Sequence, residues 1–205
     1  MKEKIVIFDF DNTLINGDSI LIAAWFASNK FNIFLRFMKI IPYFLLFKCS
    51  IINSKRFKEI FLETFKICDY FNRKNTLNYL KKIKKILNNK AMKRIKRHKR
   101  NNEKIILCSA SPFILINEIA SYLKVDLICT ELHKKNDNYY PKIIGKNCNG
   151  YEKVVRLKKY LGEINNFSLE VYGDSLGDKE LLELAEIPHY RSFDNLIKTY
   201  LKKEI

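Results

Sequence analysis

The sequence predicts an α/β fold in which a parallel sheet core carries a helical cap inserted after the first strand. Short apolar runs with the length and composition of buried parallel strands lie at residues 4–10, 104–109, 125–130 and 168–173. Helical patterns follow the last three of these runs, at 112–123, 151–161 and 178–186. Strands that alternate with helices are typical of a parallel sheet with crossover connections.

Composition restricts the class of protein further. The chain has 205 residues, of which 47% are hydrophobic and 29% charged, and this excludes a disordered tail. It contains 6 Gly and 4 Pro, which excludes collagen-like and linker-rich classes. An odd count of 5 Cys, without CxxC spacing, predicts reduced thiols rather than disulfides. Because the N-terminus also lacks a long apolar leader, we expect a cytoplasmic protein.

The first strand differs from the others because no strand pattern follows it for about 90 residues. We therefore predict a helical cap over residues 15–99, inserted into a catalytic core that comprises 1–14 and 100–205. A polar hairpin is expected at 136–147, after the third strand.

Within the predicted cap, residues 31–52 contain 16 apolar residues out of 22. The longest run without a charge, 40–47, is far shorter than the roughly 20 residues that span a bilayer. Two interpretations stay open. One is a buried cap helix kinked at Pro42, and the other is a surface that contacts lipid or a partner.

Basic residues concentrate in the segment 81–104, which holds twelve Lys or Arg and one acid, Glu103, and so carries +11 of the total charge of +16. A solvated helix face is one interpretation. Peripheral contact with an anionic membrane, at its inner face, is another. Nucleic acid is a weaker candidate partner because no aromatic residues interrupt the segment to stack on bases.

Chemistry-bearing residues follow several of the predicted strands. Asp9 and Asp11 end the first strand, and because side chains alternate along a strand they can point the same way. Ser109 ends the second, Lys153 opens a helix, and Asp174 and Asp178 follow the last strand. Ligands of open α/β sheets bind at this edge. Carboxylates, a hydroxyl and an ammonium group there suit phosphoryl transfer with Mg²⁺.

With these motifs in this order, the sequence resembles the haloacid dehalogenase (HAD) superfamily of aspartate-nucleophile phosphatases. The resemblance rests on DFDNTL at 9–14, on Ser109, on Lys153 and on GDSLGD at 173–178. It extends to the subfamily IB group that includes phosphoserine phosphatase and phosphatidylglycerophosphatase C, and it leaves most of 20–95 unmatched. It implies a Rossmann-like core.

The resemblance also implies a role for each residue. Asp9 is the nucleophile and Asp11 the general acid and base, whereas Ser109 and Lys153 bind the phosphoryl group. The Mg²⁺ ligands are Asp9, the Asp11 backbone carbonyl, Asp174 and, directly or through water, Asp178. Thr13 holds the loop. Asp18 and Ser19 are candidate substrate contacts, although both residue types also cap helices well.

We therefore expect a Mg²⁺-dependent phosphatase that forms an aspartyl-phosphate intermediate, with a lipid-linked phosphate as the favoured substrate. A soluble, phosphoserine-like metabolite is the alternative. A non-catalytic basic module that binds nucleic acid or membrane is an alternative of another class. The sequence leaves the oligomeric state, the exact substrate and the pathway open.

Overall fold

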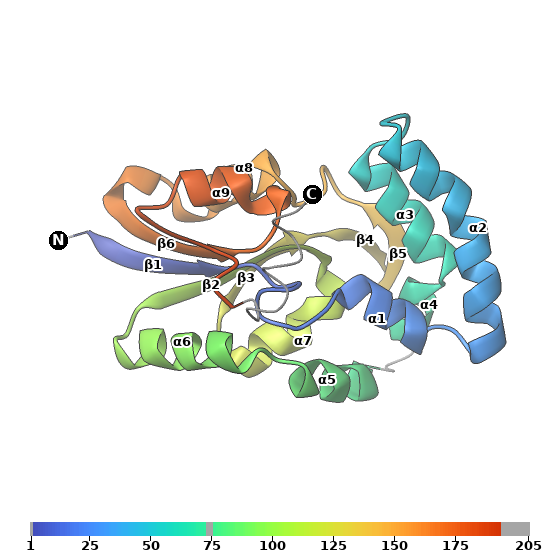
Figure 1. The fold of residues 1–205 in the computed structure, drawn as a ribbon, viewed down its shortest axis with the longest axis horizontal. Helices are drawn as coiled ribbons and strands as arrows, with labels where there is room; N and C mark the ends of the chain where they lie inside the picture. The colour runs from blue at the N-terminus through green and yellow to red at the C-terminus, as the bar shows by residue number, and fades with distance from the viewer. Residues whose placement is uncertain (1, 73–75, 194–205) are drawn as a thin grey trace, which may run out of the picture.

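The computed structural model describes residues 2–72 and 76–193, and its centre is a five-stranded parallel sheet with the order β3-β2-β1-β6-β7 (Figure 1). The predicted α/β fold class is confirmed. All four predicted strands are present, and β7 is an additional edge strand. The strands of the sheet are β1 (Glu3–Phe8), β2 (Lys104–Pro112), β3 (Asp126–Thr130), β6 (Phe167–Gly173) and β7 (Ile187–Tyr190).

The central strand β1 is buried on both faces. It pairs with β2 and β6, with Ile5 opposite Lys104 on one side and opposite Leu169 on the other. Ile5 and Ile7 pack into one hydrophobic cluster, and Val6 and Phe8 pack into the other. Alternation along the strand therefore divides its side chains between two cores, and this explains the nearly continuous apolar run in the sequence.

Helices cover both faces of the sheet (Figure 1). On one side lie α8 (Tyr151–Leu161) and α9 (Lys179–Glu183), the latter preceded by the 3₁₀ turn η2 (Leu176–Asp178). A second short 3₁₀ turn, η1 (Ile164–Asn166), precedes β6. On the other side lie α6 (Asn89–Arg100) and α7 (Phe113–Leu123). We expected α6 in the cap, but it packs against β2 through a buried stripe that includes Ala91 and Ile95. The division at residue 99 stays a prediction.

The remaining helices lie beyond the carboxyl ends of the strands (Figure 1). They are α1 (Ser19–Phe26), α2 (Lys30–Lys48), α3 (Ser54–Thr64), α4 (Ile67–Asn72) and α5 (Thr76–Lys85). The hairpin of β4 (Leu132–Lys135) and β5 (Asn138–Ile143) packs against α3 and α4. The Asn72 side chain pairs with the Tyr139 backbone through two hydrogen bonds of 2.8 Å, which fixes the hairpin to α4.

Helix α2 is exposed over most of its apolar surface. Ile33 and Ile40 are buried, but Phe31 is 74% exposed and Phe34 is 65% exposed. The interpretation of 31–52 as a buried cap helix was therefore wrong, and Pro42 lies inside the single helix α2. Among residues 2–72 and 76–193, no helix combines the length and the apolar character that crossing a membrane requires.

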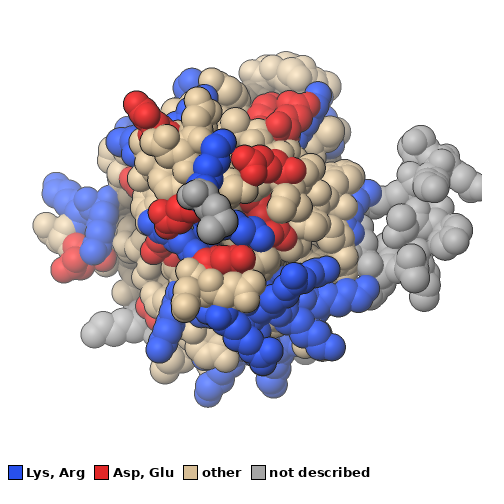
Figure 2. Space-filling view, turned by 90° about the vertical axis from the view of Figure 1, so that its left-hand side faces the viewer, with Lys and Arg blue, Asp and Glu red and all other residues tan. Residues whose placement is uncertain are grey.

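The basic segment forms a separate surface. On α6 the residues between the buried positions are exposed, among them Lys93, Arg94, Lys96 and Arg97. Figure 2 shows Lys and Arg side chains gathered along the lower part of the face it displays. In Figure 1, α6 and α2 lie toward opposite ends of the long axis of the molecule. The basic residues of α6 therefore lie apart from the exposed apolar residues of α2.

Candidate active site

The carboxyl end of β1 places two aspartates at the edge of the sheet. The Asp9 amide donates to the Tyr172 carbonyl at 2.9 Å, so the chain stays paired with β6 one residue beyond the strand. A tight turn follows, in which the Phe10 carbonyl accepts from Leu14 at 2.9 Å and Asn12 has a φ of 56°. Asn tolerates this left-handed conformation better than most residues. Asp9 therefore lies at the end of β1 and faces Lys153 of α8, whereas Asp11 lies within the turn and contacts the start of α1.

Lys153, in the first turn of α8, is a buried cation between two carboxylates. Its Nζ lies 2.6 Å from Asp9 Oδ1 and 2.6 Å from Asp178 Oδ1, and the side chain is only 2% exposed. A buried ammonium group is tolerated when it is paired and hydrogen-bonded. The two carboxylates raise the pKa of Lys153 well above its usual value, although burial opposes them, so this cation stays charged.

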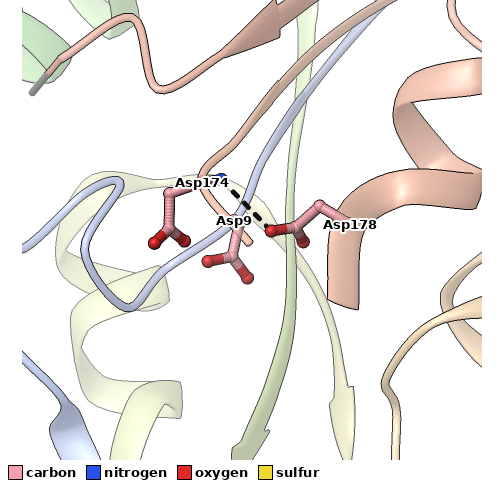
Figure 3. Close-up of side chains that lie close together, drawn as sticks. All are labelled: Asp9, Asp174 and Asp178. Carbon is pink, nitrogen blue, oxygen red and sulfur yellow. Dashed lines mark hydrogen bonds between the residues drawn. The ribbon is translucent and has the colours of Figure 1, made fainter. Parts of the chain in front are cut away.

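Three carboxylates converge beside Lys153. Asp9, Asp174 and Asp178 offer oxygens that all lie within 4.8 Å of one another (Figure 3). Asp178 is held in place because its Oδ2 accepts from the Ser175 hydroxyl at 2.9 Å and from the Ser175 amide at 3.1 Å. Gly173 allows this approach, since a Cβ there would lie 2.6 Å from the Asp178 Cβ.

The donor set fits Mg²⁺. Carboxylate oxygens are the ligands that this ion prefers. Burial raises the pKa of Asp9 to about 7, and the charges of Asp178 and Asp11 add to this effect, whereas Lys153 opposes it. Burial therefore disfavours the charged form of Asp9 more than the Lys153 ammonium group can compensate, and a divalent cation among the carboxylates would favour that charged form.

Asp11 points toward the start of α1. The Ser19 amide donates to Asp11 Oδ1 at 2.6 Å, and the Ser111 hydroxyl donates to Oδ2 at 2.5 Å. Burial and then the charge of Asp18 raise the pKa of Asp11 to about 6, whereas the hydrogen bonds from Ser111 and Ser19 lower it. A carboxyl group that titrates near neutral pH can both donate and accept a proton.

The other predicted residues lie in the same region. Ser109 is buried on β2, and its Oγ accepts from the Ser111 amide at 3.0 Å. Thr13 is buried, and its hydroxyl has no hydrogen-bond partner among the described residues. Asp18 caps α1 and accepts from the Ile20 amide at 2.9 Å. The structure thus brings these residues together, while their roles stay predictions.

Our sequence interpretation missed three residues of this region, namely Ser111, Lys58 and Asn147. Ser111 follows Ser109 by two positions in the motif SAS, and this spacing could have indicated a shared face. Lys58 on α3 donates to the Ala110 carbonyl at 2.6 Å and to Asn147 Oδ1 at 2.7 Å. Burial lowers the pKa of Lys58 to about 8, although Asp11 and Asp18 oppose this effect. Only tertiary packing brings α3 here, so sequence gave no signal for Lys58.

A family model described as haloacid dehalogenase-like hydrolase matches residues 6–183. The chain belongs to this hydrolase family. The match covers most of the chain and includes Asp9, Ser109, Lys153 and Asp178, the residues on which the resemblance was based. The predicted superfamily is therefore confirmed, and the protein is a HAD-type enzyme.

Two known proteins are similar to this chain, one in sequence and one in structure. Protein CicA of Caulobacter vibrioides is 34% identical over 92 residues, which are 44% of this chain and 41% of CicA, so the matched region is less than half of either protein. A Bordetella pertussis Tohama I protein of unknown function has a similar structure, with a TM-score of 0.75, 19% identity, and coverage of 99% of this chain and 96% of that one.

Two further solved structures have the same fold. The phosphoserine phosphohydrolase-like protein of Francisella tularensis subsp. tularensis SCHU S4 has a TM-score of 0.60 and 18% identity over 93% of this chain and 86% of its own. A phospho-aspartyl intermediate analogue of phosphoserine phosphatase has a TM-score of 0.61 and 18% identity, and the match covers 99% of each chain. At these identities the comparison shows the fold alone.

Proposed function

We propose that the protein is a Mg²⁺-dependent phosphatase that hydrolyses a phosphomonoester through an aspartyl-phosphate intermediate. The observation that carries the proposal is the position of Lys153, with its ammonium group 2.6 Å from Asp9 and from Asp178 beside a third carboxylate. A protein that only binds its ligand does not need a nucleophilic carboxylate such as Asp9 beside a buried ammonium group such as that of Lys153. The fold shared with phosphoserine phosphatases supports the same reaction class.

In the proposed first half-reaction, an Asp9 oxygen attacks phosphorus as the ester oxygen–phosphorus bond breaks, and Asp11 gives its proton to the leaving oxygen. In the second, Asp11 takes a proton from water, whose oxygen attacks phosphorus and releases Asp9. Lys153 and Ser109 bind the phosphoryl oxygens. Asp9, Asp174, Asp178 and the Asp11 carbonyl would hold Mg²⁺. When bound, this ion would neutralise phosphoryl charge.

For the substrate we propose a lipid-linked phosphate, presented at an anionic membrane surface. The exposed apolar side chains of α2 support this choice. The charge of this part of the cap also supports it. The chain contains no acidic residue between Ser19 and Lys58, so no carboxylate there would be repelled by an anionic membrane. The competing candidate is a soluble phosphomonoester, and it is favoured by the likeness in fold to phosphoserine phosphatases.

The experiment that tests the proposed reaction compares wild type with Asp9→Asn. Phosphate release is measured on soluble phosphomonoesters and on phosphorylated lipids, with and without Mg²⁺. We expect Mg²⁺-dependent turnover in wild type and essentially none in Asp9→Asn, because an amide is neither a nucleophile nor a charged metal ligand. Mass spectrometry of acid-quenched wild type should find phosphate on the peptide that contains Asp9. Substantial turnover by Asp9→Asn would exclude the covalent mechanism.

A further inference from the structure

An apolar cavity of about 510 Å³ lies between α1, α2 and α3. Nine of the thirteen side chains that line it are apolar, including the rings of Phe37, Phe44 and Phe57, so the cavity favours hydrocarbon over polar groups. Its remaining lining residues are Asp18, Ser54, Lys58 and Asn147. The cavity therefore has an apolar body and a polar end.

The polar end adjoins the catalytic carboxylates. Asp18 precedes Ser19, whose amide donates to Asp11 at 2.6 Å. Lys58 donates to the carbonyl of Ala110, the residue between Ser109 and Ser111. In the proposed reaction Asp11 protonates the leaving oxygen, so the esterified group of the substrate must lie on the Asp11 side of the phosphoryl group. The cavity begins on that side.

We propose that this cavity binds the hydrocarbon chain of the substrate, which makes the enzyme a phosphatase of long-chain, amphiphilic phosphate monoesters. The inference rests on the proposed function and specifies its substrate class. Charge complementarity supports it, because Lys58 provides a cation between the apolar body and the phosphoryl site. The helices that form the cavity also carry the exposed apolar residues of the cap, Trp25, Phe31 and Phe34 among them, so a chain can enter from an apolar surface.

Hydrophobic transfer predicts how affinity depends on chain length. Each methylene group that moves from water into the cavity should tighten binding about fourfold, until the cavity is full. A soluble metabolite lacks such a chain and would leave the cavity without an apolar occupant.

Binding of non-hydrolysable alkyl phosphonates to wild type, measured by titration calorimetry with Mg²⁺, tests the inference without any turnover. The series runs from ethyl to decyl phosphonate, below the concentrations at which micelles form. We expect affinity to rise at least tenfold across the series. Ile41→Trp, which places a larger side chain in the cavity wall, should lower affinity for decyl phosphonate at least tenfold and leave ethyl phosphonate unchanged.

Leu45→Trp is the matched control, because Leu45 lies on the same helix, is 57% exposed and does not line the cavity. This variant should bind the whole series like wild type. An affinity independent of chain length, or equal losses in the two variants, would overturn the inference. So would a dimer, detected by light scattering, that Ile41→Trp dissociates, because a second copy would then be the occupant. Inactivity toward every phosphate ester, with chain-dependent binding intact, would instead count against the proposed reaction.

Discussion

The Ser111 hydroxyl donates a hydrogen bond to the Asp11 carboxylate, with 2.5 Å between Ser111 Oγ and Asp11 Oδ2. The bond lowers the pKa of Asp11, whereas burial and Asp18 raise it. It also fixes the carboxylate against α1, because Ser111 Oγ lies 2.6 Å from Ser19 Oγ. Ser111 is therefore placed to position the proposed general acid.

Ser111→Ala should lower kcat roughly 10- to 100-fold, the size expected for loss of one hydrogen bond to a charged group. Without that bond the pKa of Asp11 rises. The fall of kcat at high pH, which marks loss of the proton from the general acid Asp11, should therefore move to higher pH. The pH profile of kcat measures both effects. Ser121→Ala, on an exposed position of α7, is the control and should behave like wild type. An unchanged pH profile with reduced kcat would point to a purely structural role.

Asp11→Asn should slow both half-reactions by about 10² to 10⁴, the usual contribution of general acid–base catalysis. The Mg²⁺ concentration that gives half-maximal rate should change little, because the proposed ligand from this residue is its backbone carbonyl. Steady-state kinetics over a Mg²⁺ titration checks this. A large rise in the Mg²⁺ requirement at unchanged saturated turnover would assign Asp11 to the metal site instead.

Gly173→Ala should abolish activity, because the new Cβ would lie 2.6 Å from Cβ and 2.8 Å from Cγ of Asp178. Asp178 must move, and its hydrogen bonds to Lys153 and Ser175 are lost with it. Phosphatase assays and thermal unfolding together measure the effect. Gly145→Asn is a fitting control, since nothing lies within 4 Å of that position and Asn tolerates its φ of +66°. Full activity in Gly173→Ala would mean that Asp178 does not need its present position.

Local sequence was sufficient to predict the sheet and the acidic residues of the site. A central parallel strand is buried on both faces, so its apolar run stands out, and the polar residues that end it lie at a predictable edge. Strand β7 was missed because its sequence, IPHY, is short, contains Pro and lies at the exposed edge of the sheet. Such a strand carries no apolar periodicity.

The placement of α6, of Lys58 and of the apolar cavity depends on tertiary packing and was not predicted from the sequence. The charge of α6 predicted a solvated helix face, and its Lys and Arg residues are exposed, but we placed the helix in the cap, whereas Ala91, Ile95 and His98 follow helical spacing and face the core. That stripe was a usable signal, and the surrounding Lys and Arg residues obscured it. Lys58 and the apolar cavity depend on how α3 docks beside α1 and α2, and no local pattern encodes that arrangement.

Glu170→Gln tests the network of hydrogen bonds and ion pairs in which the Glu170 carboxylate contacts Lys4, Tyr172 and His189. Burial raises the pKa of Glu170, but hydrogen bonds from Lys4, Tyr172 and His189 outweigh it and lower the pKa from 4.5 to about 2. Because the folded-state pKa is lowered, the stabilisation is complete above pH 4.5 and disappears as the pH falls toward 2. Glu170→Gln should therefore be less stable than wild type at pH 7, and the difference should shrink below pH 4.5.

Urea unfolding at several pH values measures this difference for Glu170→Gln. Glu118→Gln, at an exposed position of α7, controls for the loss of one negative charge and should match wild type throughout. A stability difference that stays constant from pH 7 to acid would show that the carboxylate charge is not what stabilises the fold.

Wild type should bind anionic vesicles, and the two candidate surfaces should contribute differently. Replacing Phe31 and Phe34 with Ser should remove the part of binding that persists at high salt, because these exposed side chains can enter the interface. Replacing Lys93, Arg94, Lys96 and Arg97 with Gln should remove only a salt-sensitive part, since each basic residue near an anionic leaflet contributes about 1 kcal/mol. Vesicle sedimentation at low and high salt separates the two parts.

The substitutions test the two surfaces separately, because α2 and α6 lie toward opposite ends of the long axis of the molecule (Figure 1). We expect α2 to dominate, since its helix also lines the cavity beside Asp11 and contact there would bring lipid phosphate to the site. Leu77→Ser, at a position 69% exposed on α5, is the control and should bind like wild type. If wild type ignores anionic vesicles even at low salt, the cap is a lid for a soluble substrate, because exposed apolar side chains on α2 and basic side chains on α6 would otherwise bind them.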